Sequence, residues 1–97
     1  MSIKKANLEM FKRYKLILDN CKKYADDDII IRSKKMIDVA LSEDMYEDKQ
    51  SRWLGFIQGV MVMYNIIDVE EERDFSRPLF HKAYKELGLE KPKSISV

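Results

Sequence analysis

Apolar residues recur every three or four positions along most of the chain, which is the period of an amphipathic α-helix. Strict alternation of apolar and polar residues never persists, and no two-residue hairpin turn is present, so strands are not expected. The pattern predicts an all-α bundle of about four helices. The first helix is expected from about Asn7 to Tyr24. Its apolar stripe consists of Phe11, Tyr14, Leu18, Cys21 and Ala25.

A second helix is predicted from about Ile29 to Leu41. It follows the run Asp26-Asp27-Asp28, whose carboxylates can cap a helix and interact favourably with its positive end. The buried side of this helix is expected to be Ile30, Ser33, Ile37, Ala40 and Leu41.

A third helix is predicted from Glu43 or Tyr46 to Tyr64, with Ser42 as a candidate cap. Asn65 is expected to end it in a left-handed conformation.

The fourth helix is predicted over Val69 to Leu87, where Asp68 and Glu71 have the spacing of a capping box and Gly88 ends the segment. Pro78 is expected to kink or split it, with Ser76 able to cap the second piece. Its apolar positions are Phe75, Leu79, Phe80, Ala83, Tyr84 and Leu87. Residues 1–97 therefore form a single helical domain in which about 89–97 are expected to be a loosely ordered tail.

Two glycines interrupt the apolar segment RWLGFIQGV, residues 52–60. Each costs a helix interior about 1 kcal/mol relative to alanine. At about 100° per residue, one face of this helix carries Trp53, Ile57, Val60 and Tyr64. The nearly opposite face carries Gly55, Gly59 and Val62. Small residues allow a second backbone or a ligand to approach closely, and two hypotheses follow: a central helix in a monomer, or the seam of a homo-oligomer.

Composition and charge narrow the possible partners and the compartment. The chain has 18 basic and 17 acidic side chains and a net charge of +1, so it offers no broad basic surface to extended nucleic acid, and any anion site must be local. Cys21 is the single cysteine, which suits a buried thiol in a reducing compartment. The first ten residues lack the apolar core of a signal peptide, and the longest apolar stretch is too short to span a bilayer. We therefore expect a cytoplasmic protein.

A possible ligand site lies in the predicted fourth helix. Arg73, Arg77 and His81 recur every four residues, so they form one ridge beside Phe80 and Tyr84. Guanidinium groups match the geometry of phosphate oxygens, and aromatic rings stack on bases. The ridge therefore predicts a site for an anionic nucleotide.

Arg52 and Trp53 could join this site from the third helix. The alternative is that the ridge arginines form only surface ion pairs with Glu70 and Asp74, which lie within three or four residues of them.

Two carboxylate pairs suggest an enzyme as a second possibility. Asp44 and Glu47 form D-x-x-E, and Glu71 and Asp74 form E-x-x-D, so two helices could present carboxylates to magnesium. The pattern resembles the E-x-x-E and E-x-x-D motifs of all-α nucleoside triphosphate pyrophosphohydrolases of the MazG-like kind, with Asp44 in place of a glutamate and the first pair at a predicted helix start. No Gly-rich phosphate loop, zinc spacing or nucleophile elbow is present. A non-enzymatic protein without a cofactor is therefore favoured.

The phrases R-W-L-G-F-I-Q-G and R-P-L-F-H, within Lys49 to Tyr84, resemble small helical proteins encoded by tailed bacteriophages. The resemblance implies the cytoplasm of a bacterial host and a function exerted by binding. It is compatible with an anti-defence protein that sequesters a nucleotide signal such as a cyclic oligonucleotide, or with an inhibitor that binds a host protein directly.

Overall fold

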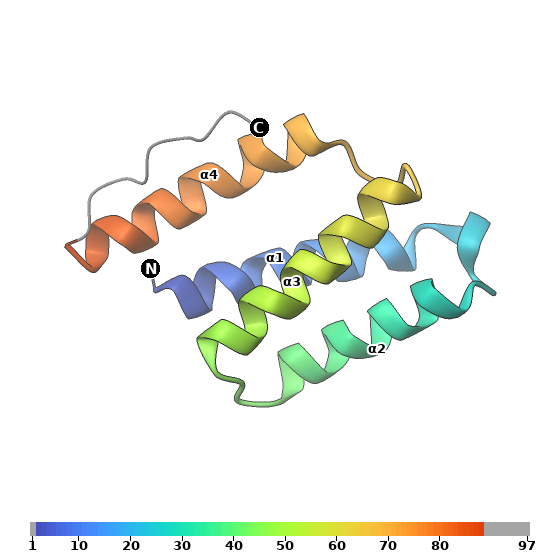
Figure 1. Ribbon diagram of the computed structural model, residues 1–97, viewed down its shortest axis with the longest axis horizontal. Helices are drawn as coiled ribbons and strands as arrows, with labels where there is room; N and C mark the ends of the chain where they lie inside the picture. The colour runs from blue at the N-terminus through green and yellow to red at the C-terminus, as the bar shows by residue number, and fades with distance from the viewer. Residues whose placement is uncertain (1, 89–97) are drawn as a thin grey trace.

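The computed structural model describes residues 2–88, which form four α-helices and one short 3-10 turn (Figure 1). In chain order these are α1 (Ile3–Asp19), η1 (Lys22–Tyr24), α2 (Asp28–Ser42), α3 (Glu47–Met63) and α4 (Val69–Glu86). Residues 2–88 contain no strand, so the all-α prediction is confirmed. The predicted tail, about 89–97, lies outside the described residues. Within residues 2–88 no helix combines the length and the apolar character needed to cross a membrane.

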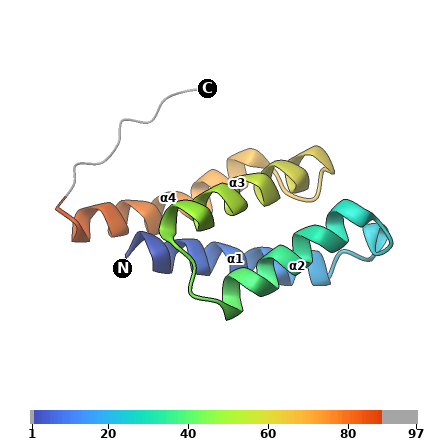
Figure 2. The same ribbon diagram turned by 60° about the horizontal axis from the view of Figure 1, so that its bottom comes forward.

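α1 is the central helix of the fold. It packs against α2, α3 and α4, whereas α3 and α4 have little direct contact with each other. In Figure 1 α2 and α4 lie on opposite sides of the α1–α3 pair. The molecule is flattened and measures 44 × 31 × 18 Å, and Figure 2 shows it turned by 60°. The hypothesis that the glycine-containing helix is central is therefore wrong.

The sequence of α1 explains its central position. Two side chains in most of its turns are buried, so its buried stripe is wide enough to contact several helices. These buried residues are Ala6, Asn7, Met10, Phe11, Tyr14 and Leu18. The helix ends at Asp19, earlier than predicted, so Cys21 is half-buried in the following loop and Ala25 is exposed.

α2 and α3 each contribute one buried face to the core. α2 contributes Ile30, Ser33, Ile37 and Ala40, as predicted, while Leu41 is half-buried. α3 contributes Gln50, Leu54, Ile57 and Met61. Of the α3 face that carries Trp53, only Ile57 is fully buried, so the core-facing side of α3 is rotated from that face. Trp53, Val60 and Tyr64 are half-buried at its edge.

α4 is one continuous helix, so of the predicted kink or split at Pro78 the split is wrong, and the kink stays a prediction. Pro78 removes the hydrogen bond to the carbonyl of Asp74, but both residues are exposed and water can replace that bond. Ser76 does not cap a second piece, because its hydroxyl donates to the carbonyl of Arg73 at 3.5 Å. Phe75 and Leu87 are exposed, contrary to prediction, and Ala83 is the one expected apolar position that is fully buried.

Most of the predicted helix ends are confirmed. Asp68 caps α4 by accepting a hydrogen bond from the N–H of Glu71 at 3.2 Å. Asn65, after α3, and Gly88, after α4, have φ angles of 56° and 73°, the left-handed conformation that ends helices. The candidate cap Ser42 is wrong, because it is the last residue of α2 and its hydroxyl donates to the carbonyl of Val39.

Asp27 connects three segments. Its Oδ1 accepts hydrogen bonds from the N–H groups of Ile29 at 2.9 Å and Ile30 at 3.2 Å, and so caps α2. The hydroxyl of Tyr64, just after α3, lies 3.0 Å from both carboxylate oxygens. The Tyr64 ring also contacts Tyr24 of η1 edge-on, with centroids 5.0 Å apart. Burial and the Asp27 carboxylate raise the pKa of Tyr64.

The three consecutive aspartates allow a matched test of this connection. Asp27→Ala removes both the α2 cap and the Tyr64 hydrogen bond, so we expect the free energy of unfolding to fall by about 1–3 kcal/mol. Asp26→Ala alters an exposed neighbour and should change it by less than about 0.5 kcal/mol. Urea denaturation of both variants measures the difference, and equal effects would contradict the assigned role of Asp27.

Candidate functional site

A groove of about 460 Å³ lies between α3 and α4, because both helices pack on α1 and have little contact with each other. Its walls are mainly apolar and consist of Gly59, Val62 and Met63 from α3, Ile67 from the following loop and Val69 from α4. The polar groups that line it are Gln58, Glu72, Arg73 and Ser76. The volume falls within the range of small-ligand sites, roughly 300–1,000 Å³, and an apolar lining with a few polar groups is typical of them.

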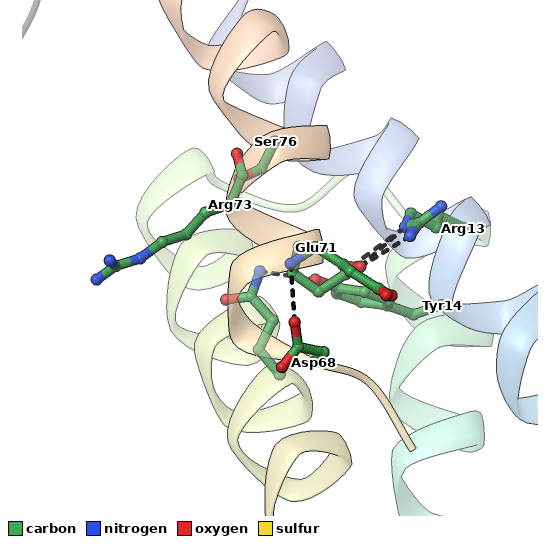
Figure 3. A network of polar contacts seen from close by, with 8 residues as sticks. Arg13, Tyr14, Asp68, Glu71, Arg73 and Ser76 are labelled. Carbon is green, nitrogen blue, oxygen red and sulfur yellow. Dashed lines mark hydrogen bonds and ion pairs between the residues drawn. The ribbon is translucent and has the colours of Figure 1, made fainter. Parts of the chain in front are cut away.

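An ion pair between buried Glu72 and half-buried Arg13 anchors α4 beside this groove (Figure 3). Glu72 of α4 is only 6% exposed, and its Oε2 lies 2.8 Å from Nη2 of Arg13 on α1. Nε of Arg13 donates to the same carboxylate at 3.2 Å, so the contact involves two nitrogens of the guanidinium. The hydrogen bonds with Glu72 raise the pKa of Arg13. The guanidinium also lies 4.1 Å from the centroid of the Phe75 ring. The charge of Glu72 is therefore already compensated by Arg13.

Tyr14 extends the same network to α3. Its side chain is fully buried, and its hydroxyl accepts a hydrogen bond from Nε2 of Gln58 at 2.8 Å. Burial is the main cause that raises the pKa of Tyr14 far above its ordinary value, and nearby Glu72 adds to the effect, whereas the Gln58 hydrogen bond opposes it. Side chains from α1, α3 and α4 therefore meet at one buried point next to the groove.

Arg73 differs from Arg13 in having no such partner. Figure 3 shows its side chain pointing away from the Arg13–Glu72 pair, and it lines the groove. Within residues 2–88 no carboxylate forms an ion pair with Arg73 or Arg77. In this part of the chain, the two arginines therefore do not form the surface ion pairs with Glu70 and Asp74 that were the alternative to a ligand site.

The remaining ridge residues follow Arg73 along α4. Because α4 is continuous through Pro78, Arg77, His81 and Tyr84 lie on successive turns, as the spacing predicts. Arg77 is exposed, and His81 and Tyr84 are half-buried.

In the described part of the chain, no hydrogen bond or ring contact joins Arg52 or Trp53 of α3 to the ridge. Arg52 is exposed, and the Trp53 ring has the ammonium of Lys49 at 5.0 Å from its centroid. Their participation in the site stays a prediction.

The glycines of α3 do not serve packing within the chain. Gly55 and Gly59 are both exposed. Apart from the adjacent backbone of α3 itself, a Cβ added at either position would have no atom within 4 Å. Gly59 lies in the groove wall beside half-buried Val62. The close approach that these residues allow is therefore left for a ligand or another chain.

The carboxylates of the pyrophosphohydrolase pattern do not come together. Asp44 lies in the α2–α3 loop and forms an ion pair with Lys4. Glu47 begins α3, while Glu71 and Asp74 follow the other end of that 17-residue helix, a separation of roughly 25 Å along its axis. Nowhere in residues 2–88 do three or more His, Cys, Asp or Glu side chains form a group that could hold a metal ion.

Sequence reasoning missed Glu72, Gln58 and Tyr14 as parts of one network. Glu72 looks like a member of the charged run that opens α4. The one clue in the sequence is its spacing: Glu72 lies one helical turn before Phe75 and Ser76, which puts it on the side of α4 that faces α1. No sequence pattern pairs it with Arg13, which lies 59 positions away.

Comparison with known proteins adds no relative: no family model matches the chain, and neither the curated proteins nor the solved structures give a match.

Tyr14 provides a pH-dependent test of the network. Its pKa is raised in the folded state, so in the unfolded chain the hydroxyl loses its proton above about pH 10 while the folded protein keeps it. The stability that this neutral hydroxyl provides is present below that pH and is lost as the pH rises. Tyr14→Phe should lower the free energy of unfolding by about 1 kcal/mol at neutral pH, and this deficit should shrink above about pH 10.

Denaturation at neutral and alkaline pH measures both effects, with exposed Tyr46→Phe as the control. A deficit for Tyr14→Phe that is independent of pH would contradict the assigned environment of Tyr14.

Proposed function

We propose that the protein is a non-enzymatic binding protein whose α3–α4 groove takes an anionic nucleotide. The observation that supports this most is Arg73, a guanidinium without an acidic partner in the described part of the chain, at the edge of an apolar groove of about 460 Å³. An arginine whose charge is not already compensated is available to phosphate oxygens.

The geometry suggests how such a ligand would lie. Its phosphates would contact Arg73, with exposed Arg77 one turn further along α4. Its base would pack against the apolar wall formed by Val62, Ile67 and Val69. Glu72 lines the same groove, but its ion pair with Arg13 reduces its repulsion of an anion. His81 and Tyr84, further along the ridge, would contact a ligand longer than a mononucleotide.

The resemblance to small helical proteins of tailed bacteriophages supports a setting for this activity. We infer an anti-defence protein in the cytoplasm of a bacterial host that sequesters a cyclic oligonucleotide signal. Sequestration requires only binding, and the net charge of +1 means that attraction to the ligand comes from the ridge and not from the whole surface.

Calorimetric titration with mononucleotides, linear dinucleotides and cyclic dinucleotides tests the proposal. We expect a cyclic dinucleotide to bind, and Arg73→Ala to weaken binding at least about tenfold, the size of one lost charged hydrogen bond. Affinity should also fall as salt rises. Arg32→Ala, which removes an exposed arginine of α2, is the charge-matched control and should bind as the wild type does. Absence of binding to every nucleotide, or an equal loss in both variants, would contradict the proposal.

Incubation with nucleoside triphosphates and Mg²⁺ distinguishes this function from pyrophosphohydrolysis. We expect no product, because one carboxylate pair lies at the start of α3 and the other in the first turns of α4, and no group in residues 2–88 could hold a metal ion. Turnover that is abolished by both Glu71→Ala and Asp74→Ala would establish an enzyme instead.

A further inference from the structure

The face of α3 that points away from the core is apolar and exposed. Phe56 is 47% exposed and Met63 81% exposed, and Ile29 of α2 adds a side chain that is 46% exposed. Together with Gly59 and Val60 these residues line a shallow groove of about 440 Å³ on the α2 side of α3. A contiguous apolar surface of this kind marks an interaction site more often than scattered apolar residues do.

The glycines give this face an alternation of projections and hollows. Phe56 and Met63 project, while Gly55 and Gly59 leave open space where other residues would place a Cβ. Each glycine weakens the helix by about 1 kcal/mol relative to alanine, and no contact within the described chain uses the space. Projection and hollow on one surface are what a two-fold interface requires, because the same patch must fit itself.

We propose that two copies of this chain pair through α3 in an antiparallel arrangement, with the two-fold axis passing between Phe56 and Gly59. This symmetry places Phe56 of the second copy over Gly59, and Gly59 of the second copy under Phe56. It also places residue 55 opposite residue 60 and residue 52 opposite residue 63. Each copy therefore fills the hollow of the other with a large apolar side chain.

Charge favours the antiparallel arrangement over the parallel one. Arg52 is an exposed positive residue on the same side of α3 as Phe56 and Gly59, and exposed Lys49 lies one turn further from the two-fold axis. In the antiparallel pair it reaches the end of α3 around Met63, where helix carbonyls lack intrahelical partners and the helix dipole is negative. Asp28 is exposed next to Ile29 in the same region. A parallel pair would instead place the two Arg52 side chains against each other.

This interface shares Gly59 and Met63 with the wall of the proposed nucleotide groove but does not share its arginines. The pairing uses neither Arg73 nor Arg77. Loss of self-association in a variant and loss of nucleotide binding in Arg73→Ala are therefore separate results.

Sedimentation velocity over a range of micromolar concentrations tests the pairing. We expect a wild-type dimer, and Gly59→Gln should weaken it at least about tenfold by filling the hollow that receives Phe56. Phe56→Ser should weaken it similarly, by removing the projection. Both positions are exposed in the single chain, so circular dichroism should show unchanged helix content. Lys35→Gln, at an exposed position of α2, is the matched control and should remain dimeric. A monomeric wild type, or dimerisation unchanged in both Gly59→Gln and Phe56→Ser, would overturn the proposal.

Disulfide trapping tests the orientation. In a Cys21→Ser background, mixing a Phe56→Cys chain with a Gly59→Cys chain should give the mixed disulfide in excess over either symmetrical one. A predominance of the symmetrical disulfide through position 59 would indicate parallel helices and contradict the antiparallel pair.

Discussion

The ion pair between Arg13 and Glu72 determines where α4 lies on the molecule. α4 buries only Glu72 and Ala83, whereas α1 buries a wide stripe along its whole length. Leu79 and Phe80 are half-buried against the core, so apolar packing holds the second half of α4, whereas its first turns depend on Glu72. A carboxylate that is only 6% exposed must be held by its partner, because an uncompensated buried charge is costly. The pair selects one position for the first turns of α4, and this position opens the groove towards α3.

The placement of α3 leaves its outer surface free. Because α1 is central, α3 needs only one buried face, and the opposite face with its two glycines has no intramolecular role. The nucleotide groove lies on one side of that face and the apolar groove of the proposed dimer on the other. The nucleotide proposal depends on α3 and α4 meeting through α1 and not through each other, and the dimer proposal depends on the outer face of α3 that α1 and α2 leave uncovered.

Local signals in the sequence were sufficient for the helices and most of their ends. Asp68, Asn65 and Gly88 act at the positions where their side-chain or backbone chemistry predicts, because caps depend on neighbouring residues alone. The choice of the central helix could not be predicted in this way. α3 is apolar around much of its circumference, so its periodicity did not distinguish the face with Trp53 from the buried face with Leu54.

The candidate site was predictable only in part. The spacing of Arg73, Arg77 and His81 places them on one ridge, and the continuous helix keeps that ridge intact. That Arg73 faces a groove while Arg13 takes the buried carboxylate depends on contacts between residues far apart in the chain. The sequence alone does not distinguish Arg13 from Arg73. Only the packing shows that the charge of Arg13 is compensated by Glu72 while the charge of Arg73 is available to a ligand.

A double-mutant cycle on Arg13 and Glu72 tests the central claim most directly. The variants Arg13→Met, Glu72→Gln and their combination are compared with the wild type by urea denaturation. If the pair holds α4 as described, the coupling energy is about 1.5–3 kcal/mol, the range of hydrogen bonds to charged groups, and the double variant loses less than the two single variants together. A coupling energy below about 0.5 kcal/mol, within the limit of simple additivity, would show that α4 is held in place by other contacts.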